Sequence, residues 1–93
     1  MVKHIVVWKL ADAAAADENA ARMKEKLEAL VGVVPCLQTA SVHRGFGGWD
    51  VCLESTHDSR EALEEYQNHP AHLEVKKFVH SVVCDRASCD FDL

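Results

Sequence analysis

The sequence has no basic block, no long apolar run and no closely spaced cysteine pair, and each absence argues against a class of protein. Acidic residues outnumber basic ones by 15 to 10, so the formal net charge is −5. This charge argues against nucleic acid or an anionic membrane surface as a partner. The apolar run at the N-terminus is too short to span a membrane and lacks a small-residue cleavage site. We therefore expect a soluble, cytoplasmic protein.

Cysteine and glycine spacing also exclude common cofactor motifs. The chain has four cysteines, but none forms the C-x-x-C pair that is typical of zinc modules. Without an export signal, reduced thiols are the default, and we expect Cys52 and Cys84 to act as small buried hydrophobic residues. The GFGG segment, residues 45–48, lacks the strand and helix context of a dinucleotide-binding loop. No metal and no cofactor are predicted.

What is present indicates one small globular domain over residues 1–93. The apolar fraction is 48%, and no repeat or low-complexity segment interrupts the chain. Residues 2–10 form the clearest predicted strand, because they are rich in β-branched and aromatic side chains. Ile5 and Val7 lie on one face of this strand. The other face carries His4, Val6, Trp8 and Leu10.

Both faces of this strand are apolar, so both should be buried. In a small α+β domain, helices can cover one face of the sheet. A second copy of the chain is the simplest cover for the other face. A homodimer is therefore expected from the pattern of residues 2–10 alone.

The rest of the chain predicts helices and strands in a regular order. Asp58 and Glu61 form a capping-box pattern at the start of a helix, and Pro70 should end that helix at about Asn68 and begin a new helical stretch. The order is then β-α-β-β-α-β, the ferredoxin-like α+β arrangement with helices on one face of an antiparallel sheet. The other predicted elements are a helix over 12–31 ending at Gly32, strands over 37–44 and 49–55 that form a hairpin, and a last strand over 83–92.

The segment YQNHPAHLEV, residues 66–75, concentrates the groups that could carry chemistry. A histidine against an apolar pocket can act as a general base, and a tyrosine hydroxyl can hold a substrate oxygen. Tyr66 and His72 are the candidate catalytic residues, with His4 beside them. Asp50 could orient a histidine by accepting its ring N–H. His69 and His72 alone make a weak metal site, because a catalytic zinc has at least three protein ligands.

Each of these residues also has a structural interpretation. His4 could be a buried histidine that is bonded to a carboxylate or to the backbone. His69, before Pro70, could act only as a helix terminator, and Tyr66 could fill core volume. The sequence offers no reason to assign a role to three further histidines, which are interpreted as surface or turn residues: His43, His57 and His80.

The combination of segments resembles the stress-responsive α/β-barrel domain family, Dabb, from Val2 to about Leu93. The similarity is carried by VKHIVVWKL, WDVCLES and EALEEYQNHPAHLEV. Its most specific parts are Val2-Lys3-His4 and Tyr66-x-x-His69-Pro70-x-His72. The resemblance implies a ferredoxin-like protomer that dimerises through its sheet to form a dimeric α+β barrel. It also implies a ligand cavity beside the sheet.

The resemblance implies a function only in outline. The family includes stress-induced oligomers, bacterial members without assigned activity, and a plant olivetolic acid cyclase that performs an aldol condensation without a cofactor. By this resemblance, His72 would be the base, Tyr66 would engage the substrate oxygen, and His4 would line the pocket. The cyclase has a histidine where this chain has Asp50, and we expect Asp50 and His69 to act as supporting residues. Trp8 should fill part of that pocket. The expected ligand is a small apolar carbonyl or polyketide-like compound, converted, if at all, by cofactor-free cyclase or lyase-like chemistry.

The sequence leaves open whether the protein is an enzyme. In one alternative it is a non-catalytic stress-response protein, structural or binding, whose polar cluster is a hydrogen-bonded network. In a second alternative it is a heme- or quinol-directed monooxygenase. That alternative depends on fold analogy alone, and a fold does not determine a function.

Overall fold

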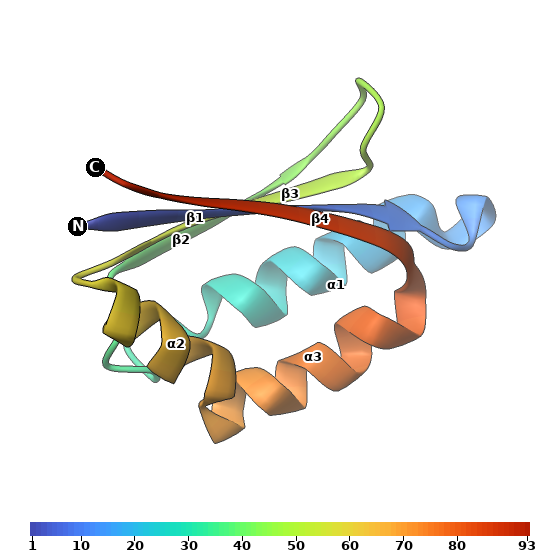
Figure 1. Cartoon of the computed structure of the whole chain (residues 1–93). Helices are drawn as coiled ribbons and strands as arrows, with labels where there is room; N and C mark the ends of the chain where they lie inside the picture. The colour runs from blue at the N-terminus through green and yellow to red at the C-terminus, as the bar shows by residue number, and fades with distance from the viewer.

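Four strands form one antiparallel sheet, and the helices cover one of its faces in the computed structural model, which describes residues 1–93 (Figure 1). The strands are β1 (Val2–Leu10), β2 (Thr39–Arg44), β3 (Val51–His57) and β4 (Val83–Asp92). The helices are α1 (Ala16–Glu28), α2 (Arg60–Asn68) and α3 (Pro70–Val82), with a short 3-10 helix η1 (Ala13–Ala15) before α1. The predicted ferredoxin-like β-α-β-β-α-β order is confirmed.

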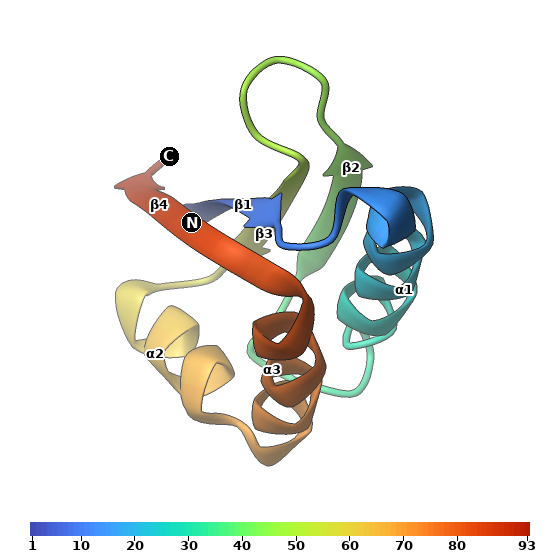
Figure 2. The ribbon, with the colours of Figure 1, turned by 90° about the vertical axis from the view of Figure 1, so that its right-hand side faces the viewer.

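The strand order in the sheet is β2-β3-β1-β4, so β1 lies in the middle. Its register places His4 opposite Ser55 of β3 and Asp90 of β4. The side chains that face the helices alternate along β1 as predicted, and all of them are buried: Val2, His4, Val6, Trp8 and Leu10. Ile5 and Val7 point to the opposite face, which no helix covers (Figure 2).

The hydrophobic core fills the space between the sheet and the helices. Sixteen buried apolar residues form it. Helix α1 contributes Met23 and Leu27, and α3 contributes Val79. These side chains recur at helical spacing, which places them on one stripe that packs against the sheet. One layer of helices on one sheet face therefore encloses a single core.

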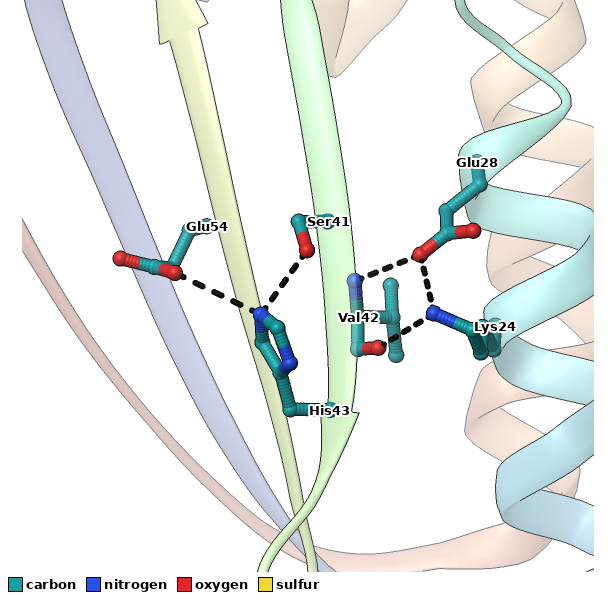
Figure 3. A network of polar contacts seen from close by, with 6 residues as sticks. All are labelled: Lys24, Glu28, Ser41, Val42, His43 and Glu54. Atoms are coloured by element: carbon teal, nitrogen blue, oxygen red, sulfur yellow. Dashed lines mark hydrogen bonds and ion pairs between the residues drawn. The ribbon is translucent and has the colours of Figure 1, made fainter.

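Helix α1 also protects the outer edge of β2 through the network in Figure 3. The Glu28 carboxylate accepts hydrogen bonds from the Val42 backbone N–H (2.9 Å) and from Lys24 Nζ (2.7 Å). Lys24 Nζ also donates to the Val42 carbonyl oxygen (2.9 Å). Unpaired backbone groups on an edge strand invite pairing with another chain. The ion pair on α1 satisfies both backbone groups of Val42.

The break between α2 and α3 follows the prediction. Helix α2 ends at Asn68, and α3 begins at Pro70, whose missing N–H costs nothing in the first turn. His69 lies between them in an extended conformation, with φ of −66° and ψ of 135°. Its Nδ1 accepts a hydrogen bond from the Ala71 backbone N–H (3.1 Å), so His69 caps α3.

Several predicted boundaries were wrong. The helix predicted over 12–31 is shorter, because η1 precedes it and turns follow Glu28. Gly32 has a φ of 89° in those turns and does not directly end the helix. The third strand spans 51–57 in place of the predicted 49–55.

Two predictions about individual residues also fail. The N-cap of α2 is Ser59 and not Asp58, because Ser59 Oγ accepts the Ala62 N–H (3.1 Å). Cys84 is exposed and Cys52 is only half-buried, so neither is a buried hydrophobic residue.

Candidate functional site

A small cavity lies between the sheet and the helices. Its volume is about 50 Å³. Its apolar lining comes from the sheet, α1 and α3: Val6, Trp8, Leu27, Leu53 and Val79. Its polar lining is His4, Gln67, His72, Lys76, His80 and Arg86. Trp8 lines the cavity beside His4, as predicted, and its bulk occupies space that a ligand could otherwise use. This volume is far below the roughly 300–1,000 Å³ of typical ligand pockets, so the cavity has room for one end of a compound, with the remainder at its mouth.

His72 and Tyr66 lie together, as the sequence suggested. Their ring centroids are 4.2 Å apart, with the planes inclined by 38°. Both side chains are buried, with 7% of His72 and 0% of Tyr66 exposed. The Tyr66 hydroxyl and His72 Nδ1 have no hydrogen-bond partner in the protein. His72 reaches the cavity wall, whereas Tyr66 lies behind it and does not line the cavity.

His4 is held by a carboxylate, but not by the one that was predicted. Its Nδ1–H donates to Oδ1 of Asp90, which lies directly opposite on β4. Because Nδ1 carries this proton, the second ring nitrogen, Nε2, is free to accept one when the ring is neutral. His4 is one of the polar residues that line the cavity. Asp90 therefore has the orienting position that was expected for Asp50.

Asp50 lies at the far end of β1 and takes no part in the cluster. Its carboxylate accepts the Leu10 N–H (2.7 Å), and Oδ1 is 3.6 Å from Arg44 Nη1. Leu10 is six residues from His4 along an extended strand, a separation of about 20 Å. The prediction for Asp50 was wrong because tertiary contacts, which no local pattern reveals, place this carboxylate beside Leu10 and not beside His4.

His57 was interpreted as a surface or turn residue, and this was wrong. It is fully buried, with its ring centroid 4.9 Å from that of Tyr66. Its Nδ1–H donates to the Cys36 carbonyl oxygen (2.9 Å), since a carbonyl can only accept. Nε2 must then accept the Ser55 hydroxyl (3.0 Å). Both nitrogens are satisfied, so His57 is a structural neighbour of the candidate site.

The other two histidines are exposed, as predicted. His43 lies on the uncovered face of the sheet, where Nε2 contacts Ser41 Oγ at 2.8 Å and Glu54 Oε2 at 3.5 Å (Figure 3). His80 also lines the cavity, which the sequence did not indicate. His69 caps α3 and does not line the cavity, so its terminator interpretation is the one that the geometry supports.

Burial changes the titration of the central residues. It lowers the pKa of His72 to about 4, and the positive charge of Lys76 adds to this effect. Burial also lowers the pKa of His57, against the opposing hydrogen bond to Cys36. The pKa of Tyr66 is raised well above its ordinary value, mainly by burial. At neutral pH, His72 is therefore an uncharged imidazole and Tyr66 an uncharged phenol.

No three His, Cys, Asp or Glu side chains are grouped so that they could hold a metal ion. No helix has both the length and the apolar character that are needed to cross a membrane.

Comparison with known families identifies the chain. The Stress responsive A/B Barrel Domain, Dabb, matches residues 2–93. The protein belongs to the Dabb family. This confirms the resemblance that was carried by the His4 and Tyr66–His72 segments, and it covers nearly the whole chain. A search of curated proteins found no significant match.

Solved structures with the same fold support the assignment. A dimeric protein of unknown function with a ferredoxin-like fold from Bacteroides fragilis is 26% identical, with a TM-score of 0.90 and coverage of 99% of this chain and 95% of that one. A hydroxynitrile lyase from Passiflora edulis is 16% identical, with a TM-score of 0.84 and coverage of 99% and 92%. An antibiotic biosynthesis monooxygenase is 12% identical, with a TM-score of 0.79 and coverage of 100% and 98%. The last two are similar in fold alone.

Proposed function

We propose that this Dabb protein binds a small carbonyl compound in the cavity beside β1 and converts it by cofactor-free acid–base chemistry. The observation that carries the proposal is the pair of buried atoms without a partner, the Tyr66 hydroxyl and His72 Nδ1. Leaving a buried polar group unsatisfied costs about 1–3 kcal/mol. A purely structural cluster would satisfy these atoms, as it does for His57. Their free hydrogen-bonding capacity therefore favours a ligand.

In this proposal His72 is the base and Tyr66 supports the substrate oxygen. His72 removes a proton from the carbon next to the carbonyl, and the electron pair moves onto the carbonyl oxygen, which forms an enolate. The neutral phenol of Tyr66 lies behind the cavity wall in the free protein, so substrate binding must open a path to its hydroxyl before it can donate a hydrogen bond to that oxygen. The protonated His72 can then return this proton to the product, while His4, oriented by Asp90, is a second imidazole beside the cavity.

An aldol condensation begins when a base removes a proton from the carbon next to a carbonyl, and the cleavage of a hydroxynitrile begins when a base removes the hydroxyl proton as cyanide leaves. The resemblance to a cyclase and the likeness to a hydroxynitrile lyase thus point to related chemistry. The small cavity favours a short substrate over a long polyketide, because Trp8 occupies part of the space. A monooxygenase role is supported only by fold likeness at 12% identity.

Proton exchange tests this proposal directly. Butanone and 4-oxopentanoate are incubated with the protein in deuterium oxide, and loss of the α-proton signals is followed by NMR. We expect exchange above the buffer rate, and a loss of at least about 100-fold in His72→Gln, the usual range for general base catalysis. Tyr66→Phe should also slow it. His69→Asn, which retains a capping side chain outside the cavity, is the matched control.

If the cluster has only a structural role, substitution of His72 should change stability and not proton exchange. If His72→Gln lowers the melting temperature sharply and no carbonyl compound binds or exchanges, then the cluster stabilises the helix break and is not catalytic. The non-catalytic alternative would then replace the enzyme proposal.

We also propose that the active form is a homodimer that pairs the uncovered sheet faces. Ile5 and Val7 are half-buried on that face although no helix covers it. The solved relative from Bacteroides fragilis is dimeric. A second sheet would remove these apolar side chains from water, which is the usual reason for such pairing.

A further inference from the structure

Basic side chains are concentrated at the cavity, although the protein as a whole is negatively charged. Lys76 and Arg86 line it together with three histidines, and none of its lining residues is aspartate or glutamate. Yet the chain has 15 acidic and only 10 basic residues. Arg86 is exposed and Lys76 half-buried, whereas His4 and His72 are buried. Lys76 and Arg86 therefore form an outer cationic rim over the buried histidines His4 and His72.

The two rim cations have no acidic partner. Every other arginine in the chain forms an ion pair with a carboxylate: Arg22, Arg44 and Arg60. The Arg86 guanidinium makes neither a hydrogen bond nor an ion pair. Lys76 Nζ donates only to the Gln67 carbonyl oxygen, at 3.2 Å. In an acidic protein, unpaired cations on the wall of a cavity indicate an anion that arrives from outside.

The fold directs both charges to the same opening. Lys76 follows His72 by four residues in α3, so both lie on one face of the helix. Arg86 lies opposite Trp8 in the sheet. Because successive residues of a strand point to opposite faces, Arg86 and Asp90, four residues apart on β4, both point to the helix-facing side. Trp8 and His72 both line the cavity. The cations thus approach it from two walls.

We infer that the compound bound in this cavity is an oxo acid, whose carboxylate pairs with Arg86 and Lys76 at the rim while its carbonyl group points inward to His72. The inference rests on the proposed function and names its substrate class. A guanidinium matches the two oxygens of a carboxylate, and an ammonium adds a second donor. The cavity of about 50 Å³ requires a short compound.

A carboxylate at the rim would also strengthen the proposed base. In the free protein, burial and then the charge of Lys76 hold the pKa of His72 down to about 4, and Arg86 acts in the same direction. An anion bound to both cations offsets their charge and raises this pKa towards neutral. A base acts most effectively when its pKa is near the working pH. The carboxylate of the substrate would then raise the pKa of the base that acts on the same substrate.

Paired probes test the inference. The affinities of 4-oxopentanoate and of its neutral methyl ester are measured by calorimetry, and the imidazole signals of His72 are followed by NMR. We expect the carboxylate to bind at least about tenfold more tightly than the ester, as charge-assisted bonds allow. Arg86→Met and Lys76→Met should remove most of that preference. Arg22→Met and Lys77→Met change equivalent charges away from the cavity and should keep it.

The outcomes separate this inference from the proposed function. Equal affinity for acid and ester, with proton exchange that still requires His72, would overturn the oxo-acid assignment and leave the carbonyl proposal standing. Binding of inorganic phosphate alone as tightly as 4-oxopentanoate would identify a general anion site and also overturn the assignment. No binding and no exchange with either compound would overturn both.

Discussion

His72 shows how the setting of one residue changes its chemistry. A free histidine titrates near 6.5, but burial against Tyr66 and the nearby Lys76 bring its pKa to about 4. The protein therefore keeps this imidazole neutral throughout the physiological range. His57, also buried, has both nitrogens satisfied by Ser55 and Cys36. Of these two histidines, only His72 keeps a free buried nitrogen for a ligand.

The lowered pKa of His72 predicts acid destabilisation in a defined range. Between pH 6.5 and about 4, the unfolded chain binds a proton at this site and the folded chain does not. The free energy of unfolding should therefore fall as the pH falls through this range, by at most roughly 1.4 kcal/mol per pH unit. Urea unfolding at several pH values measures it.

The matched variant for this prediction is His72→Gln, which cannot titrate. Its unfolding free energy should depend less on pH over the same range, while His69→Asn should keep the slope of the unaltered protein. Identical slopes in His72→Gln and the unaltered protein would show that His72 is not the group that responds.

At the scale of elements, the two edges of the sheet differ. Strand β2 has its outer backbone groups at Val42 bonded by Lys24 and Glu28 of α1 (Figure 3). Strand β4 has no helix along its outer edge, and nine of its ten residues are exposed. Yet β4 supplies Asp90 and Arg86 to the site. One edge is therefore protected by α1, and the open one carries side chains of the candidate site.

Removing the Glu28 carboxylate should destabilise the β2 edge. Glu28→Ala leaves the Val42 N–H without its partner and removes the ion pair with Lys24, so we expect a loss of about 1–2 kcal/mol in unfolding free energy. Chemical denaturation measures this loss. Glu25→Ala, one turn away on the exposed side of α1, is the control and should change stability by less than about 0.5 kcal/mol.

The hydrogen bonds from Lys24 and Val42 also lower the pKa of Glu28. The contribution of this carboxylate is therefore present above its unfolded value of 4.5 and lost as the pH falls through the lowered folded value. If Glu28→Ala were as stable as Glu25→Ala at neutral pH, the network would be only a surface contact.

On the scale of the whole molecule, the helices cover one sheet face and leave the other open (Figures 1 and 2). The open face carries Ile5 and Val7 of the central strand. A chain of 93 residues buries a small core, and the proposed pairing of two sheets would add to it. The similar protein from Bacteroides fragilis is dimeric, so at least one protein with this fold forms dimers.

Charges on the uncovered face should separate the proposed dimer. The double variant Ile5→Lys, Val7→Lys places two like charges at the centre of each facing sheet, and we expect a shift from dimer to monomer in sedimentation velocity. Leu73→Lys, at an exposed apolar position of α3, should remain dimeric. A dimer that survives the double variant would mean that the protein associates through another surface.

Local pattern was enough to predict the order of the elements and the faces of β1. Alternation in residues 2–10 and the proline at position 70 act through near neighbours in the chain, so a sequence can reveal them. Tyr66 and His72 are also near neighbours in the chain, so the sequence could reveal that they cluster. His4 is distant in sequence, and its grouping with them was suggested by its residue type and supported by the family resemblance.

The tertiary structure alone decided which distant residues complete the site. Asp90 and not Asp50 holds His4, and Arg86 reaches the cavity, because strand register brings β4 beside β1. His57 is buried because β3 extends two residues beyond its predicted end, under the cover of the Cys36 loop. Register and burial depend on contacts between segments far apart in sequence, and no local pattern encodes those contacts.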